Sequence, residues 1–309
     1  MRRFVAWTVP VAALALIAAG CASGDSADRA ESTGTGTVTE TTEAAAGADN
    51  PLIVEAVDQY HAYAVEQTEE LVRVTRTFTD AVRAGDLPAA QAAYAPSRQP
   101  WERIEPLAAL VEQIDVLIDA RVDDFAGIDD PAFSGWHRLE HLLFEQNTTE
   151  GGVPFADQLD RDVARLRDEM ASLEIAPVDV PVGAAELIEE VSEGKVTGEE
   201  NRYAKTDLWD FEANLQGSRV AIDTLSPALA EADPALLGRI NDGFDEIFET
   251  MQPLRRGDGW VLYCTEDDPY PSPRCPEVTV PRQTVDTLKA QLAGLSEEVS
   301  QVAGVLDLK

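Results

Sequence analysis

Residues 50–85 read NPLIVEAVDQYHAYAVEQTEELVRVTRTFTDAVRAG. Asn50 is a typical helix N-cap, and Pro51 suits the first helical position because the N–H that it lacks would be unpaired there anyway. Apolar side chains then recur at helical spacing until Gly85, a typical helix stop. The stretch therefore predicts one long amphipathic helix. Its apolar positions are Ile53, Ala56, Val57, Tyr60, Ala64, Leu71, Val74 and Phe78.

The rest of the chain repeats this helical pattern. We expect helices at 88–94, 98–120, 134–145, 154–173, 183–192, 207–225, 234–254 and 281–306. No stretch alternates apolar and polar residues in a sustained way, so we expect no sheet. The proline-containing segment 176–181 is expected to be non-helical and to join two halves, residues 50–176 and 182–309. The predicted fold class is all-α, with two packed helical bundles.

The composition is that of an acidic globular protein. The 309 residues include 24 Lys and Arg against 57 Asp and Glu, which gives a formal net charge of −33. Hydrophobic residues at 44% and charged residues at 26% are ordinary for folded domains, which excludes a wholly disordered chain. A surface this acidic repels phosphate backbones, so nucleic acid is not expected as a partner. Cations, or proteins with positive patches, are favoured instead.

The first twenty residues resemble a secretory signal. Two arginines precede an almost wholly apolar run, and small residues then lead to Cys21. A small-residue run that ends in Cys also resembles a bacterial lipobox, which predicts removal of residues 1–20 and lipidation of Cys21. Ordinary cleavage near Ala22, with Cys21 incidental, is the alternative.

Residues 21–49 are dominated by Ala, Ser, Thr, Gly and acidic residues, and Val38 is their only large aliphatic residue. Such a segment cannot bury a core, so it predicts a flexible tether. With a lipid on Cys21, the tether would hold residues 50–309 at the extracytoplasmic face of the cell membrane.

The other two cysteines, Cys264 and Cys275, flank a proline-rich acidic loop. Lipidation of Cys21 would leave them as an even pair in an exported protein. We expect them to form a structural disulfide, which an oxidising compartment favours. Two free thiols and a metal-binding pair are the alternatives.

The strongest local motif is GWHRLEH at residues 135–141. On a helix, His137, Glu140 and His141 share one face. The chain has three histidines, and two of them lie here. Imidazole and carboxylate groups on one helix face make half of a metal site, whose other ligands must come from other helices. A solvated face with an internal His–Glu contact is the alternative.

Carboxylates at helical spacing are candidates for those other ligands. Glu102 and Glu105 lie about one turn apart, and Asp115, Asp119 and Asp123 continue at four-residue intervals. Like charges at this spacing repel one another on a helix, and a bound cation would reverse the effect. The alternative is an ordinary solvated face, because carboxylates are frequent throughout this chain.

Two further stretches contribute polar groups. Glu66 lies in the first long helix, and residues 197–210, TGEENRYAKTDLWD, gather polar side chains between helices. Thr206 or Asp207 is expected to cap the helix that follows. The chain has no glycine-rich phosphate loop and no G-x-S-x-G motif, so nucleotide binding and serine hydrolysis have no support.

These motifs resemble those of the imelysin-like family, and within it the EfeO-type lipoproteins of bacterial iron uptake. The family motif Gly-x-His-x-x-Glu is matched by Gly135, His137 and Glu140. The Tyr-Glu-Arg-Ile-Glu-Pro stretch is matched at 101–106, with Trp101 in place of Tyr. Further matches are Ile-Asp-Ala-Arg at 118–121, the Gly-Glu-Glu to Asp-Phe stretch at 198–211, the loop 256–259 and the stretch 300–304. Within 198–211, Asn201 stands where Asp is usual and Lys205 where His is common. The resemblance therefore extends over about residues 52–306.

The resemblance implies a cleft between the two bundles, in which a carboxylate-rich site binds iron as Fe²⁺ or Fe³⁺. The metal ligands that it implies are His137 and Glu140 with Glu102, Glu105 and Asp119, while Glu66 is a weaker candidate and His141, where Lys is common, could be an extra ligand. It implies a transport role, not an enzyme, with an iron permease and a haem peroxidase of the same uptake system as partners. EfeO proteins usually carry an N-terminal cupredoxin domain where this chain has the tether, so it resembles the short EfeM type.

The ligand chemistry points to the same metals. Carboxylates with a single imidazole suit iron, manganese and other hard or borderline divalent cations. Two alternatives stay open. His137, Glu140 and His141 also fit the H-x-x-E-H pattern of zinc peptidases, in which His141 would be essential. A carboxylate-rich helical cleft could instead bind an acidic polysaccharide through a bridging cation.

Overall fold

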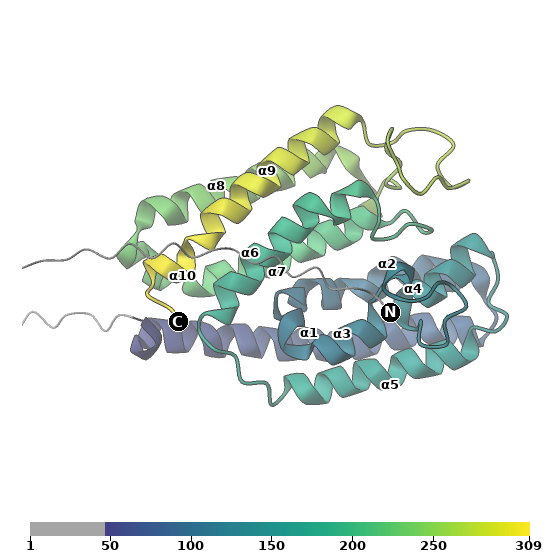
Figure 1. Ribbon diagram of the computed structural model, residues 1–309, viewed down its shortest axis with the longest axis horizontal. Helices are drawn as coiled ribbons and strands as arrows, with labels where there is room; N and C mark the ends of the chain where they lie inside the picture. Colours follow the sequence, from purple (N-terminus) through teal and green to yellow (C-terminus); the bar gives the residue numbers. More distant parts are fainter. Residues whose placement is uncertain (1–46) are drawn as a thin grey trace, which may run out of the picture. The chain divides into compact units, whose positions relative to one another are not determined.

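Helices form nearly all of the regular structure, so the all-α prediction is confirmed (Figure 1). The computed structural model describes residues 47–309. The predicted signal 1–20, Cys21 and the tether as far as residue 46 lie outside the described residues. The α-helices are α1 (Pro51–Arg83), α2 (Leu87–Ile104), α3 (Glu112–Ile118), α4 (Gly135–Glu140), α5 (Val153–Met170), α6 (Asp179–Glu193), α7 (Asp207–Ala232), α8 (Pro234–Met251), α9 (Arg282–Ser300) and α10 (Val302–Val305).

Short helical turns and one hairpin complete the described elements. The turns are η1 (Gly47–Asp49), η2 (Glu105–Val111), η3 (Val122–Asp124), the π-helical η4 (His141–Glu145), η5 (Lys195–Thr197) and η6 (Gln252–Leu254). Strands β1 (Arg255–Arg256) and β2 (Gly259–Trp260) pair antiparallel, with Arg255 opposite Trp260. The expectation of no sheet is wrong by this one hairpin.

Helix α1 follows its sequence pattern closely. The side chain of Asn50 accepts a hydrogen bond from the Leu52 N–H at 2.9 Å, and Pro51 is the first helical residue. Six of the apolar positions that the sequence predicted are buried, and the chain leaves the helix at Gly85, whose φ is 72°. The six are Ile53, Ala56, Tyr60, Ala64, Leu71 and Phe78. Local signals were sufficient to predict this helix because capping, period and stop all agree.

Helix α2 departs from its predicted boundaries. It runs unbroken through Pro96 and Pro100, whereas the sequence predicted separate helices at 88–94 and 98–120. The break comes instead at Glu105, where η2 begins. Most of the second half of α2 is buried, and this packing outweighs the backbone hydrogen bonds that the prolines remove. The prediction for 176–181 is also wrong in part, because Pro181 lies in the first turn of α6, where proline is tolerated.

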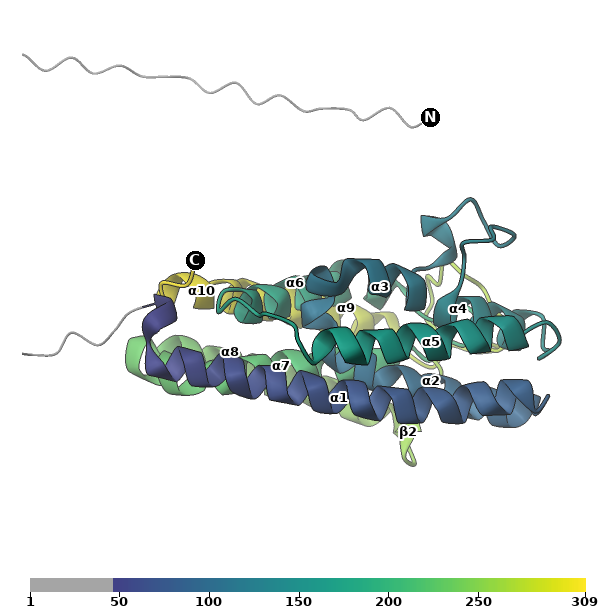
Figure 2. The same cartoon turned by 90° about the horizontal axis from the view of Figure 1, so that it is seen from below.

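The helices pack as two groups, α1 to α5 and α6 to α10 (Figure 1). Seen from below, the first group lies in front of the second (Figure 2). In the first group α1 lies between α2 and α5, with α3 and α4 against α5. In the second, α6 packs on α7 and α9, and α8 joins α7 to α9. The groups meet mainly where α7 contacts α2 and α1, and where α6 contacts η2.

Two glycines allow the close approach between the groups. A Cβ on Gly217 of α7 would lie 1.8 Å from the carbonyl oxygen of Arg103 in α2. A Cβ on Gly183 of α6 would lie 1.9 Å from the carbonyl oxygen of Pro106 in η2. Only glycine fits at such distances, so the polar side chains of α2 and α7 are brought face to face. Within residues 47–309, no helix combines the length and apolarity needed to cross a membrane.

Candidate metal centre

Several buried acidic side chains contact Arg98 of α2, whose own side chain is fully buried. Its guanidinium donates to Glu102 on the same helix and to Asp119, which follows α3. It also donates to Glu200 Oε1 at 2.6 Å and to Asp210 Oδ1 on α7 at 3.4 Å. We call these five residues together with His137 the Arg98 cluster. A buried arginine is stable only with such partners, because an unpaired charge in the interior is costly.

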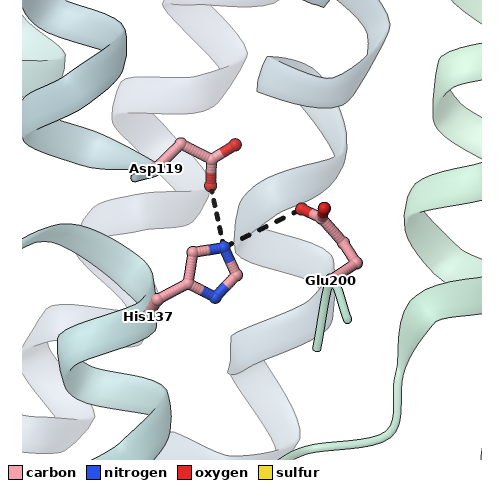
Figure 3. Close-up of side chains that lie close together, drawn as sticks. All are labelled: Asp119, His137 and Glu200. Carbon is pink, nitrogen blue, oxygen red and sulfur yellow. Dashed lines mark ion pairs between the residues drawn. The ribbon is translucent and has the colours of Figure 1, made fainter. Parts of the chain in front are cut away.

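Gly135 brings His137 to this cluster. Its φ is 77°, and a Cβ there would lie 2.2 Å from the carbonyl oxygen of Ile118. Because glycine lacks that atom, α4 begins directly against the end of α3. His137 Nε2 consequently lies 3.5 Å from Asp119 Oδ1 and 3.8 Å from Glu200 Oε1 (Figure 3).

Glu140 lies behind His137 and fixes the orientation of its ring. His137 Nδ1 is 2.9 Å from Glu140 Oε2. The other oxygen, Oε1, accepts hydrogen bonds from the backbone N–H groups of Tyr203 and Ala204, both at 2.8 Å. An Nδ1–H that donates to a carboxylate leaves Nε2 available for a cation. Metal-binding histidines usually donate their other ring N–H to a carboxylate in this way.

Two groups of ligand atoms in the described residues are close enough to hold a metal ion. The first is Asp119, His137 and Glu200, and the second is Glu102, Glu200 and Asp210. Within each group the ligand atoms all lie within 4.8 Å of one another, every residue is buried, and Glu200 belongs to both. Oxygen atoms with one imidazole nitrogen form a donor set that suits iron or manganese.

Lys195 and Asn214 hold the edge of the cluster where Glu105 lies. Lys195 Nζ is 2.7 Å from Glu105 Oε2 and 3.1 Å from Glu102 Oε2. The Asn214 amide donates to the same two oxygens at 2.7 and 3.0 Å. Glu105 is thereby held by α7 and η5 and is outside both ligand groups. Arg121 Nη1 is 2.5 Å from Glu200 Oε2, the oxygen that also lies 3.8 Å from Lys195 Nζ.

The carboxylates of the cluster differ in their affinity for protons. Burial raises the pKa of Glu102 and of Asp210 well above the ordinary value, despite the opposing charge of Arg98. Burial would also raise the pKa of Asp119 and Glu200. The charge of Arg98 and the contact with His137 nevertheless hold the pKa of Asp119 well below its ordinary value. The charges of Lys195, Arg121 and Arg98 lower the pKa of Glu200 to about 2.

His137 favours its protonated form. Burial and the charge of Arg98 act to lower its pKa, but the contacts with Asp119 and Glu140 outweigh them and raise it to about 9. A proton therefore occupies the site that a cation would take near neutral pH. A metal ion that binds here must displace protons, as is usual for histidine ligands.

Two of the predicted candidates lie away from the cluster. Glu66 is on the exposed face of α1. His141 begins the π turn η4, and its ring packs edge-on against Tyr203 with centroids 5.1 Å apart. Because His141 belongs to neither ligand group, the geometry does not favour the H-x-x-E-H peptidase pattern, which needs both histidines on one ion. The predicted disulfide between Cys264 and Cys275 is confirmed.

The expected cap of α7 is wrong. Thr206 stands at the N-cap position, but its side chain makes no capping hydrogen bond. Asp207 instead accepts a hydrogen bond from the Asn201 N–H at 3.3 Å, and burial raises its pKa to about 7. The polar stretch 197–210 therefore contributes Glu200 and Asp210 to the Arg98 cluster but no side-chain cap to α7.

Comparison with known proteins places these motifs in a family. A family model described as imelysin matches residues 56–299. The chain belongs to the imelysin family. This imelysin chain is 42% identical over 254 residues to proteins named iron uptake system component EfeO from Escherichia coli O157:H7, Escherichia coli K12 and Shigella flexneri. The match covers 82% of this chain but 64% of each relative, so it spans slightly less than two thirds of their length.

The sequence patterns of this imelysin chain indicated no role for four residues of the site: Arg98, Lys195, Glu200 and Asp210. Glu200 and Asp210 lie within the matched stretch 198–211, and that match was the signal that could have found them. Arg98 and Lys195 gave no signal of their own, because helical spacing identifies residues on one face but not the residues that face them from another helix.

Proposed function

We propose that this protein binds iron at the Arg98 cluster outside the cytoplasm and delivers it to a membrane permease. The observation that carries the proposal is the convergence of His137, Asp119 and Glu200 in one buried group. The name of the relatives, iron uptake system component, supports iron as the cargo. The residues of the proposed site all lie within residues 56–299, the part of the chain that the family model matches.

In this proposal, His137 Nε2, Asp119 and Glu200 are metal ligands. Glu140 is a positioning residue, because it orients the His137 ring and contacts the backbone at Tyr203. Glu102 and Asp210 supply further oxygen atoms through the group that shares Glu200. The two ligand groups together contain four acidic side chains, which suit a cation of charge 2+ or 3+ better than a monovalent ion.

Lipidation of Cys21 and the tether 21–49 would keep the iron-binding helices beside the permease, and a haem peroxidase would be a further component of the same system. A metal-bridged polysaccharide site is less well supported, because a bridging ion must face the surface. Every residue of both ligand groups is buried.

The test is an anaerobic calorimetric titration of the purified chain with Fe²⁺, compared with Mn²⁺, Zn²⁺ and Ca²⁺. We expect micromolar or tighter binding of Fe²⁺ that falls at least a hundredfold in both His137→Ala and Glu200→Gln. Glu66→Ala is the matched control, because Glu66 is an exposed carboxylate outside the cluster. Fe²⁺ binding that survives both cluster variants, or tight Zn²⁺ binding with Fe²⁺ ignored, would contradict the proposal.

A further inference from the structure

The ligand atoms of the proposed site already contact a cation that belongs to the chain. Arg98 contacts all four carboxylates of the two ligand groups, and its Nη1 lies 3.4 Å from His137 Nε2. The same Asp119 oxygen, Oδ1, accepts from Arg98 and faces His137. A metal ion bonded to that oxygen and to Nε2 would share Oδ1 with the guanidinium, and the two positive charges would repel each other at close range.

The two oxygens of each of these four carboxylates have different partners. One oxygen of each faces Arg98, and the other is held by a different group. Glu102 Oε2 faces Lys195 at 3.1 Å, and Glu200 Oε2 faces Arg121 at 2.5 Å. The outer oxygen of Asp119 accepts from Trp101 Nε1 at 2.8 Å, and that of Asp210 accepts from the Asn201 amide.

This division leaves four inner oxygens whose one shared partner is Arg98. If Arg98 withdrew, the outer contacts would still hold each carboxylate in place, with its inner oxygen aimed at the vacated space. Preorganised oxygens around a space of cation size are what a hard metal ion needs.

We propose that Arg98 is an internal counter-cation that neutralises the metal-free site and must leave these inner oxygens when iron binds. Loading and release of iron are then an exchange of one cation for another within the same set of carboxylates. The inference rests on the proposed function and deepens it. Arginine suits this role because its planar fork contacts several carboxylates at once and does not lose its proton.

The exchange has a consequence for affinity. Any ion that enters must displace Arg98 from the inner oxygens, so Arg98 weakens metal binding while it stabilises the empty protein. This opposes the role of a supporting residue, whose removal would weaken binding. The sign of the change in affinity therefore separates the two roles.

The test is calorimetric titration of wild-type chain, Arg98→Gln and Arg98→Lys with Mn²⁺, and anaerobically with Fe²⁺. We expect Arg98→Gln to bind Mn²⁺ at least tenfold more tightly than wild type and to melt at a lower temperature without metal. Arg98→Lys, which keeps the charge but loses the fork, should have an intermediate affinity. Arg73→Gln is the matched control, because Arg73 is an exposed arginine paired with Glu70 on α1, and it should equal wild type.

A second measurement needs no substitution at Arg98. In ¹⁵N-arginine-labelled wild-type protein, the Arg98 side-chain N–H should exchange slowly with solvent and should become faster to exchange on saturation with diamagnetic Zn²⁺. If Arg98→Gln binds metal as wild type does or more weakly, or if the N–H stays protected with metal bound, the inference fails and the proposed function stands. If neither wild type nor Arg98→Gln binds any of these ions, the proposed function fails as well.

Discussion

Helices α1 and α2 are neighbours in the sequence and in space, yet they bury different kinds of side chain. The buried face of α1 is apolar apart from threonines, and it carries no buried charge. The buried face of α2 includes Arg98 and Glu102 among its apolar and aromatic residues. The difference indicates that burial on α1 stabilises the fold. Helix α2 instead buries charged side chains at a cost in free energy, and this burial places them in the candidate site.

The largest expected effect is on stability and comes from α1. Phe78 is fully buried and packs edge-on against Tyr94. Phe78→Ala should lower the free energy of unfolding by about 3–5 kcal/mol, because it removes apolar contacts and leaves a cavity. Urea denaturation measures this, and Val54→Ala, at a residue that is 48% exposed, is the control with little change. Iron affinity of the folded variant should match wild type; a large loss of affinity would break the division between the two helices.

The disulfide should act on both stability and binding. Replacement of Cys264 and Cys275 by serine opens a loop with a sequence separation of 11, which should lower the free energy of unfolding by about 3 kcal/mol. The same loop holds residues that support the site, because Arg274 Nε donates to the Ala204 carbonyl at 3.2 Å. Metal affinity should therefore fall as well, by a smaller factor than in His137→Ala. Unchanged affinity in calorimetry would show that the loop does not support the site.

The affinity for Mn²⁺ should depend strongly on pH. The pKa of His137 is raised to about 9, so a metal ion must displace its proton at pH 7. Affinity should rise about tenfold per pH unit between pH 7 and 9 from this residue alone. Glu102 and Asp210, whose pKa values burial raises, act in the same direction. A flat profile would contradict this, and His141→Ala should keep the slope because His141 is in neither ligand group.

The stability of the metal-free protein should change with pH in the opposite direction. The pKa of His137 in the folded protein lies above its ordinary value of 6.5. Its contribution to stability is therefore complete below about pH 6.5 and is lost as the pH rises through 9. Thermal melting of the metal-free chain at pH 7 and 9 measures the loss, and Mn²⁺ should oppose it. Equal melting temperatures at both pH values would contradict this linkage.

The smallest expected effect comes from a positioning residue. Glu140→Gln keeps the size of the side chain but weakens the contact with His137 Nδ1. Because outer partners of metal-binding histidines typically affect affinity by 10- to 100-fold, we expect a loss of about tenfold. Calorimetry measures it, with Glu145→Gln on the exposed end of η4 as the control. A loss as large as that in His137→Ala would show that Glu140 is itself a ligand.

The same contrast shows what could be predicted from the sequence. Helix α1 was predicted almost to the residue, since its cap, period and stop are all local. Helix α2 was not, because burial between α1 and α7 overrides the local signal of Pro96 and Pro100. Long-range packing of this kind leaves no trace in a single helical period.

The candidate site was predicted in outline only. The spacing of His137, the resemblance and the acidic run indicated a metal site, and the structure brings His137, Asp119 and Glu102 together around Arg98. It does not bring Glu66 or His141 there. The positive partners were missed because a buried charged residue has the same sequence signature as an exposed one, and its partners come from distant parts of the chain.

The most direct measurement is anomalous diffraction at the iron absorption edge from a crystal of this protein loaded anaerobically with Fe²⁺. The proposed site requires an iron peak bonded to His137 Nε2 and to carboxylate oxygens of Asp119 and Glu200. The role inferred for Arg98 requires in addition that its guanidinium has withdrawn from those oxygens. An iron peak elsewhere, such as among exposed carboxylates, or no peak at all in a crystal whose Arg98 contacts are intact, would contradict iron binding at the Arg98 cluster.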